Sequence, residues 1–497
     1  MMEQKRMLLA TGSCQGEGPC TVNMIDRFSN LPEGVFHHIL SKFSIKDLAR
    51  FCCVSKRWRE LCLSSPSVEF CGFSEDGIMD MACELRLKLV NALDRFLLSR
   101  GDNEMKSFVL FWDGHSDEEL DEACFCVNEN FRIITWIQNA VRCKVEKVYL
   151  DVTFFDYEGE PLAFPSCVFR SASLTSIVVN MPRTVVKTPS FTFSSNIEKL
   201  HLSDVVIQDE GFFEWISYSC KSLKDVTLSA VREIHSITIE SSSLEKFYFI
   251  NYEVDETCHI NISGEKLEEI NVRCNHSPSS TILKIVAPNV KRLLLEGNVK
   301  NHLNLGELKC LEQAAILMEP IVDEFNKVFE VLSSLCSVEV LVLNEATIQA
   351  AYREECVQAQ LDETWYLQMN IGSFTDDLVP AVVSLLRGTP ELCTLYIRYK
   401  PTSLDPKSNT SGFDMEYWKM QNLDFVSQVE DVTIELSAGF NGIELARYIL
   451  EHAESLEKMV IRYLAEQSNA IGKLKESKMI SNPLVTFEEY DSSVTLF

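Results

Sequence analysis

The 497-residue chain lacks the short motifs that accompany most nucleotide, metal and serine chemistry. It contains no Gly-x-Gly-x-x-Gly, no phosphate loop ending in Gly-Lys-Ser/Thr, no His-Glu-x-x-His and no Gly-x-Ser-x-Gly. Histidine occurs only nine times, and the one adjacent pair, His37-His38, lies in an apolar helical segment. A Cys/His pair that only the fold brings together stays open as an alternative. We therefore expect no catalytic residues, no cofactor and no metal.

Cysteine is plentiful, at 18 residues, but Cys-x-x-Cys spacing is absent. The nearest neighbours are Cys52-Cys53 and Cys124-x-Cys126, and most others stand singly in apolar stretches. Zinc sites and small disulfide frameworks need paired spacings, whereas free cysteine in a reducing compartment behaves as a small buried hydrophobe. The cysteines therefore predict neither a metal centre nor a disulfide scaffold.

Long apolar runs are also missing. Residues 1–20 carry Lys5-Arg6 but only four successive apolar residues, Met7 to Ala10, which is too short for a signal peptide. No run approaches the length that a membrane-spanning helix needs. We expect an intracellular protein, in the nucleus, the cytoplasm or both.

Positive charge is scarce overall, with a formal net charge of −27. General nucleic-acid binders and proteins that bind anionic membranes need basic surface, so both classes are disfavoured. The stretch from Asp26 to Leu63 is an exception, because it holds seven bases and four acids, a local charge of +3. Its positive charge either attracts an acidic partner protein or reflects a chance distribution of charged residues.

Three short amphipathic helices are predicted in the segment 31–63. Pro32 suits a first helical turn, and the first helix repeats apolar residues on one face: Val35, Phe36, Ile39, Leu40 and Phe43. Ser44 to Asp47 has the form of a capping box and begins a second helix. Ser55 can cap a third helix that bears Trp58. So few residues rarely form a self-sufficient core, which predicts either a partner protein or a helical cap on a larger domain.

The same segment resembles the F-box. The matching elements are Leu31-Pro32, Ile39-Leu40-Ser41, Lys46-Asp47-Leu48 and Val54-Ser-Lys-Arg-Trp58, in the spacing of that family. The resemblance implies docking on a Skp-type adaptor, which bridges to a cullin scaffold. Carried over position by position, it implies these adaptor contacts: Leu31, Pro32, Phe36, Ile39, Leu40, Leu48, Val54, Trp58 and Leu61.

One local pattern recurs from residue 145 onward: an aliphatic residue, two polar residues and an alternating apolar strand. Between Leu174 and Val338 the start-to-start intervals are 23, 26, 21, 23, 23, 21 and 27 residues. These intervals are typical of leucine-rich repeats, in which each turn contributes one strand to a parallel sheet. The degenerate consensus favours an irregular arc, and a two-layer α/β domain is the weaker alternative.

The segments between the predicted strands differ along the chain. Helices are predicted for 211–221 and 324–335. Ser-rich connecting segments without a helix are predicted for 171–173 and 241–243. The stretch 346–369 is expected to interrupt the array as a Gln/Glu-rich helix. The predicted strand, helix and strand at 429–436, 441–450 and 456–462 resemble the FBD domain of plant F-box proteins.

The whole chain therefore resembles a plant F-box/FBD/LRR-repeat protein. The predicted fold class is α/β: an N-terminal three-helix F-box, an irregular leucine-rich-repeat solenoid of parallel strands and a C-terminal FBD-like unit. The expected division is a disordered N-terminus (1–25), the F-box (26–70), a helical linker (71–106), the solenoid (107–400), a flexible loop (401–412) and the FBD-like unit (413–485).

This resemblance implies a substrate-recognition subunit of an SCF-type E3 ubiquitin ligase that has no catalytic residues itself. The F-box would dock the adaptor and, through it, the cullin, and the arc would bind an unidentified target protein. The alternative is a scaffold or sequestering protein that uses the same adaptor contact without ubiquitin transfer.

Overall fold

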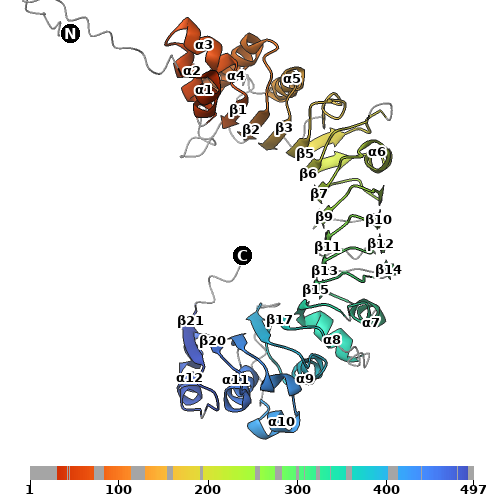
Figure 1. Ribbon diagram of the computed structural model, residues 1–497, viewed down its shortest axis with the longest axis vertical. Helices are drawn as coiled ribbons and strands as arrows, with labels where there is room; N and C mark the ends of the chain where they lie inside the picture. Colours follow the sequence, from red (N-terminus) through yellow and green to blue (C-terminus); the bar gives the residue numbers. More distant parts are fainter. Residues whose placement is uncertain are drawn as a thin grey trace, which may run out of the picture.

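The computed structural model describes residues 31–41, 43, 45–71, 83–113, 129–153, 161–190, 194–251, 258–274, 282–297, 302–306, 308–320, 325–335, 337–353, 361–400, 412–437, 439–477 and 479–490. Figure 1 shows an arc, with the N-terminal helices at one end and the last strand at the other. The sequence prediction of a disordered segment 1–25 lies outside the described residues, as does nearly all of the predicted flexible loop.

A 17-stranded parallel sheet runs along the inner side of the arc (Figure 1). Its strands are β1 (Ser67–Cys71), β2 (Ser107–Asp113), β3 (Lys147–Thr153), β4 (Leu162–Ala163), β5 (Ser176–Val186), β6 (Lys199–Ile207), β7 (Asp225–Ser229), β9 (Lys246–Asn251), β11 (Glu269–Cys274), β13 (Arg292–Gly297), β15 (Gln313–Met318), β16 (Val340–Asn344), β17 (Tyr366–Ile371), β18 (Thr394–Tyr399), β19 (Asp431–Glu435), β20 (Lys458–Tyr463) and β21 (Leu484–Glu489). Each strand that the repeat pattern predicted is present, which confirms the solenoid.

Alternation along the strands explains why the sheet forms. In β9, for example, Phe247 and Phe249 are buried while Lys246 and Tyr248 stay partly exposed. Because side chains alternate between the two faces of a strand, the buried residues of successive repeats form one continuous core. A single repeat cannot cover such a face, so neighbouring repeats stabilise one another.

The outer layer changes character along the arc. Helices cover the sheet near its ends: α4 (Cys83–Arg100), α5 (Glu129–Arg142), α6 (Gly211–Ser219), α7 (Phe325–Ser333), α8 (Glu345–Arg353), α9 (Val379–Arg387), α10 (Met415–Met420), α11 (Asn441–His452) and α12 (Ser468–Lys475). In the middle a second parallel sheet takes their place, built from β8 (Ser236–Glu240), β10 (His259–Ser263), β12 (Ile282–Val286) and β14 (His302–Asn304). The predicted helices at 211–221 and 324–335 are confirmed, whereas this outer sheet was not foreseen.

The predicted interruption at 346–369 is wrong in its second half. The helix α8 is present, but β17 follows it and pairs in parallel register with β16 and β18. The array therefore continues through this region. This strand was not predicted because Thr364 occupies the position that an aliphatic residue holds in the other repeats. The buried Thr364 hydroxyl donates to the Val338 carbonyl at 2.7 Å.

The first repeat begins earlier than the expected solenoid. β1 pairs with β2 over five residues, and α4 contributes Val90, Leu93 and Leu97 to the solenoid core. The structure thus places the first strand and helix of the array within the segments that the sequence assigned to the F-box and to a linker.

The C-terminal region contains the predicted order of strand, helix and strand as β19, α11 and β20. It joins the same sheet as the repeats, since β19 pairs with β18 and β21 pairs with β20. Among the described residues, no helix is long and apolar enough to cross a membrane.

Candidate partner-binding site on the N-terminal helices

Three helices of eight residues each form the N-terminal module: α1 (Glu33–Leu40), α2 (Ile45–Cys52) and α3 (Lys56–Leu63). α1 begins one residue later than predicted, because Pro32 is its N-cap, in an extended conformation. The Pro32 carbonyl accepts from the amides of Val35 at 2.9 Å and Phe36 at 3.0 Å. Ser55 caps α3 as predicted, with its hydroxyl accepting from the Trp58 amide at 3.2 Å. Ser44, the predicted cap of α2, lies outside the described residues.

The module has its own small core. Phe36, Leu40, Leu48 and Cys62 are at most 1% exposed and form a cluster separate from the solenoid core. Of the nine predicted adaptor contacts, Phe36, Leu40 and Leu48 therefore lie inside the module in this structure. Their position supports the packing of the three helices rather than an open contact surface.

Partly buried aromatic side chains pack against that core. The Trp58 ring lies 5.2 Å from Phe36 in an edge-on arrangement and 5.1 Å from Phe51 in a stacked one. Phe51 in turn lies 5.0 Å from Phe43. Such pairs stabilise a module beyond the area that they bury. Trp58 nevertheless stays partly exposed, so the ring has both internal contacts and accessible surface.

The remaining predicted contacts keep surface open to solvent. Val54 is 65% exposed, Pro32 is exposed, and Leu31, Ile39 and Leu61 are half-buried. Val35 is also 47% exposed. Val35 was not among the predicted contacts. Its position on the apolar face of the first predicted helix could have identified it as one. The module thus presents apolar side chains that its own small core does not enclose.

The charged groups on α3 point outward. Lys56, Arg57 and Arg59 are all exposed, and the Arg59 Nε donates to the Cys52 carbonyl at 3.2 Å. On α2, Arg50 pairs with Asp47 at 3.3 Å, an exposed pair that contributes little to stability. The helix that follows the exposed Val54 thus carries three exposed bases and one exposed acid, Glu60.

A thiol pair links α2 and α3. The hydrogen bond from the Cys62 thiol, together with the nearby Arg59 charge, lowers the pKa of Cys52 to about 7 against the opposing effect of burial. The same hydrogen bond and burial raise the pKa of Cys62. Cys52 is therefore the more acidic thiol of this pair, and it is only half-buried.

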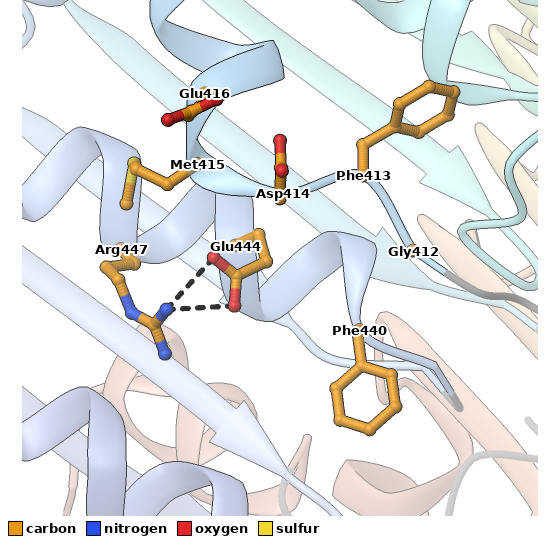
Figure 2. Close-up of a pocket in the computed structure, with 8 residues that line it drawn as sticks. All are labelled: Gly412, Phe413, Asp414, Met415, Glu416, Phe440, Glu444 and Arg447. Carbon is orange, nitrogen blue, oxygen red and sulfur yellow. Dashed lines mark hydrogen bonds and ion pairs between the residues drawn. The ribbon is translucent and has the colours of Figure 1, made fainter.

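A shallow pocket in the C-terminal region offers a second candidate site (Figure 2). Three of its four charged side chains have partners within the chain, Glu416 being the fourth. Arg447 pairs with Glu444 at 3.0 Å, as Figure 2 shows, and the Asp414 carboxylate caps α10 by accepting from the Tyr417 amide at 3.0 Å. In the described part of the chain, no group of three or more His, Cys, Asp or Glu residues could hold a metal ion. The pocket thus supports no catalytic or metal assignment.

Comparison with known proteins agrees with this geometry. The F-box domain model matches residues 28–70, and the model described as the At1g61320/AtMIF1 LRR domain matches residues 117–279. The fold and the matched domain models define the class: the chain has an F-box domain followed by an array of leucine-rich repeats.

Relatives over nearly the whole length come from Arabidopsis thaliana. The F-box/FBD/LRR-repeat protein At5g56420 is 24% identical over 447 residues, which cover 88% of this chain and 92% of the relative. The FBD-associated F-box protein At4g13985 is 22% identical over 484 residues, with 95% and 96% coverage. The F-box/LRR-repeat protein 13 is 21% identical over 448 residues, with 88% and 89% coverage. The predicted resemblance to plant F-box/FBD/LRR-repeat proteins is confirmed.

Proposed function

We propose that this chain is the substrate-recognition subunit of an SCF-type cullin E3 ubiquitin ligase and has no catalytic residues of its own. The N-terminal module binds a Skp-type adaptor, the adaptor bridges to the cullin, and the arc binds the target protein. The chain acts in the nucleus, the cytoplasm or both, and it binds neither nucleic acid nor membrane.

The observation that carries this proposal is the apolar surface of the N-terminal module. Val54 is 65% exposed and Val35 47% exposed, on a module in which four of the described residues are fully buried. Exposed apolar groups on so small a unit mark a protein-interaction site. The exposed bases Lys56, Arg57 and Arg59 suit an acidic adaptor, because opposite charges steer association.

Six of the nine predicted contacts are proposed to touch the adaptor directly. They are the ones with accessible surface: Leu31, Pro32, Ile39, Val54, Trp58 and Leu61. Phe36, Leu40 and Leu48 are proposed to act from inside, by holding α1 and α2 in place. The proposed division of the chain keeps an F-box at 26–70 and an FBD-like unit at 413–485.

The arc contributes by holding the target close to the ubiquitin-charged enzyme. A tethered lysine experiences a high effective concentration of the reacting thioester. This route needs only binding surfaces in the receptor, which agrees with the absence of catalytic motifs from the sequence.

The proposal is tested by co-expressing the chain with a Skp-type adaptor and measuring co-purification. Val54→Asp places an unpaired charge in the contact and should reduce adaptor recovery at least tenfold, since truncation of central interface residues often costs about 2 kcal/mol. Val286→Asp is the matched control, because Val286 is 47% exposed on β12, in the outer sheet of the solenoid. Equal recovery of the adaptor with both variants would contradict the proposal.

A scaffold or sequestering role without ubiquitin transfer uses the same adaptor contact. The two roles differ in the fate of the target. Proteins that proximity labelling captures on this chain should accumulate when the proteasome is inhibited if the chain is a ligase receptor, and should stay constant if it is a scaffold.

A further inference from the structure

Charged side chains are unevenly distributed on the concave strand face of the arc. The strands that form this face can be followed in Figure 1. On β6 to β11 the ion pairs form a ladder: Asp225 lies 3.7 Å from Lys199 and 3.1 Å from His201, and Glu269 lies 3.6 Å from Lys246. The ladder ends on β13, where Arg292 pairs with Glu269 at 2.5 Å. In this part of the face every carboxylate named has a cationic neighbour.

A second group of charges lies on β18 to β21. The Tyr396 hydroxyl donates to Glu435 at 2.7 Å, and Arg462 contacts Glu435 at 3.0 Å and Glu488 at 2.9 Å. The ladder and this group are separated by three strands of the sheet.

Those three strands, β15, β16 and β17, carry no charged residue at any concave-facing position. They are neighbours in parallel register, and their partly exposed or exposed side chains alternate with buried ones. The concave-facing positions, here called the uncharged window, are Gln313, Ala315, Leu317, Val340, Val342, Asn344, Tyr366, Gln368 and Asn370. The chain as a whole has a net charge of −27. The absence of charge from the concave-facing positions of three adjacent strands therefore distinguishes this part of the face.

Hydrogen bonds organise the polar side of the window. The Tyr366 hydroxyl donates to the Gln368 side-chain carbonyl at 3.3 Å, and the Gln368 amide donates to the Asn370 side-chain carbonyl at 2.8 Å. Because these hydrogen bonds run from Tyr366 through Gln368 to Asn370, the side-chain NH2 group of Asn370 is the donor at the end of the row. Burial raises the pKa of Tyr366, as expected for a side chain with restricted access to water.

This composition matches the centre of a protein interface. Interface cores are depleted of charge and enriched in tyrosine, with charged residues at the border. The window has that arrangement, with ion pairs on either side along the arc. Its apolar part consists of Ala315, Leu317, Val340 and Val342.

We propose that the uncharged window binds a segment of the target protein that has apolar and uncharged polar side chains. The apolar side chains pack on Leu317 and Val342, and backbone carbonyls of the segment accept hydrogen bonds from Gln368 and Asn370. This inference rests on the proposed function, because it assigns the target-binding part of the arc.

The window offers no counter-charge to a charged residue at its centre. A Lys or Glu over Val342 would be desolvated without a counter-charge on the window, which is strongly unfavourable. The nearest concave-facing acids along the sheet, Glu296 and Glu435, are already paired with Arg273 and Arg462. The nearest concave-facing cation is the exposed Arg398, which lies on β18 in register with Asn370, two strands away from Val342. Strands lie about 4.8 Å apart, so crossing from β15 to β17 takes about three or four residues of an extended segment.

The test uses the full chain co-purified with its adaptor and an array of acetylated nine-residue peptides. One set has five uncharged central residues, rich in Leu, Val and Gln, and the matched set has one Lys or Glu at the centre. The uncharged set should bind at least tenfold more strongly than the charged set. Val342→Lys should remove this preference, whereas Val286→Lys on the outer sheet should retain it.

The inference is overturned if the charged peptides bind equally well, if no set binds, or if Val342→Lys and Val286→Lys behave alike. Adaptor recovery measured on the same samples separates the two proposals. Intact adaptor binding together with lost peptide discrimination would refute the window alone, whereas loss of adaptor binding in the unmodified chain would refute the proposed function.

Discussion

Trp58 both packs within the N-terminal module and stays partly exposed. Its contacts with Phe36 and Phe51 belong to the module itself, so truncation to Ala would remove internal packing as well as partner contacts. Large-to-small changes at buried aromatic positions typically cost about 3–5 kcal/mol. Val54, with 65% of its surface exposed, is therefore the better position at which to separate binding from folding.

Cys52 provides a pH-dependent test at the residue scale. Thiolates rather than thiols react with iodoacetamide, and the pKa of Cys52 is lowered to about 7 by its hydrogen bond with Cys62. Labelling of Cys52, followed by peptide mass spectrometry, should therefore be slow below this pH and fast above it, with a midpoint near 7.

Two comparisons check that interpretation. Cys62→Ala removes the hydrogen bond, so the Cys52 midpoint should move up toward the ordinary thiol value of about 8.5. Burial raises the pKa of Cys393, so that residue should label only at higher pH. A Cys52 midpoint that is unchanged by Cys62→Ala would contradict the assigned cause.

At the element scale, a buried ion pair connects α4, β2 and α5. Arg86 on α4 donates twice to Glu129 on α5, at 2.6 Å each, and the Trp112 indole donates to the same carboxylate at 2.9 Å. The Arg86 guanidinium also lies 4.5 Å from the centre of the Trp112 ring. Both charged residues are buried, with Arg86 only 2% exposed.

Glu129→Gln should destabilise this end of the array. It leaves the buried Arg86 charge uncompensated, which typically costs about 3–5 kcal/mol. Trp112 and Trp136 lie in the same cluster, so a urea titration followed by tryptophan fluorescence reports the change. The double variant Arg86→Met/Glu129→Met should recover most of the lost free energy of unfolding, and a double variant as unstable as Glu129→Gln would contradict this account.

Local sequence pattern predicted most elements and the buried side of the repeat strands, but not which apolar side chains of the N-terminal module are enclosed. Phe36 and Val35 are neighbours on the apolar face of α1, yet one is 1% and the other 47% exposed. The difference depends on where α2 and α3 pack, which periodicity does not encode. The outer strands were missed although Ile237 and Ile239 alternate as strand residues do, because short Ser-rich connecting segments were expected there instead.

Strand β17 was also missed, and the cause lies in one residue of its repeat. A polar Thr364 stands where other repeats have Leu or Val, and only the folded arrangement provides the acceptor for its buried hydroxyl. The uncharged window escaped prediction because it is formed by three strands that lie next to one another only in the folded array. Spacing within one repeat contains no information on that juxtaposition.

At the scale of the whole molecule, two separate cores predict two unfolding events. The described residues of the N-terminal module include four fully buried ones, which form a cluster distinct from the continuous core of the array. Scanning calorimetry should therefore show a small transition at lower temperature and a larger one for the array, since small cores are marginally stable.

Adaptor binding should shift only the smaller transition. At about 100 times the dissociation constant, a ligand stabilises the state that it binds by about 2.7 kcal/mol. A single cooperative transition that the adaptor shifts as a whole would show that the module and the array are not independent units.

The most direct measurement of the central claim is a calorimetric titration of the full chain with a purified Skp-type adaptor at several temperatures. Burial of the exposed apolar side chains around Val54 on binding should give one-to-one stoichiometry and a clearly negative heat-capacity change, and Val54→Asp should remove the binding heat. Absence of binding, or binding with unchanged affinity in the Val54→Asp variant, would contradict the account.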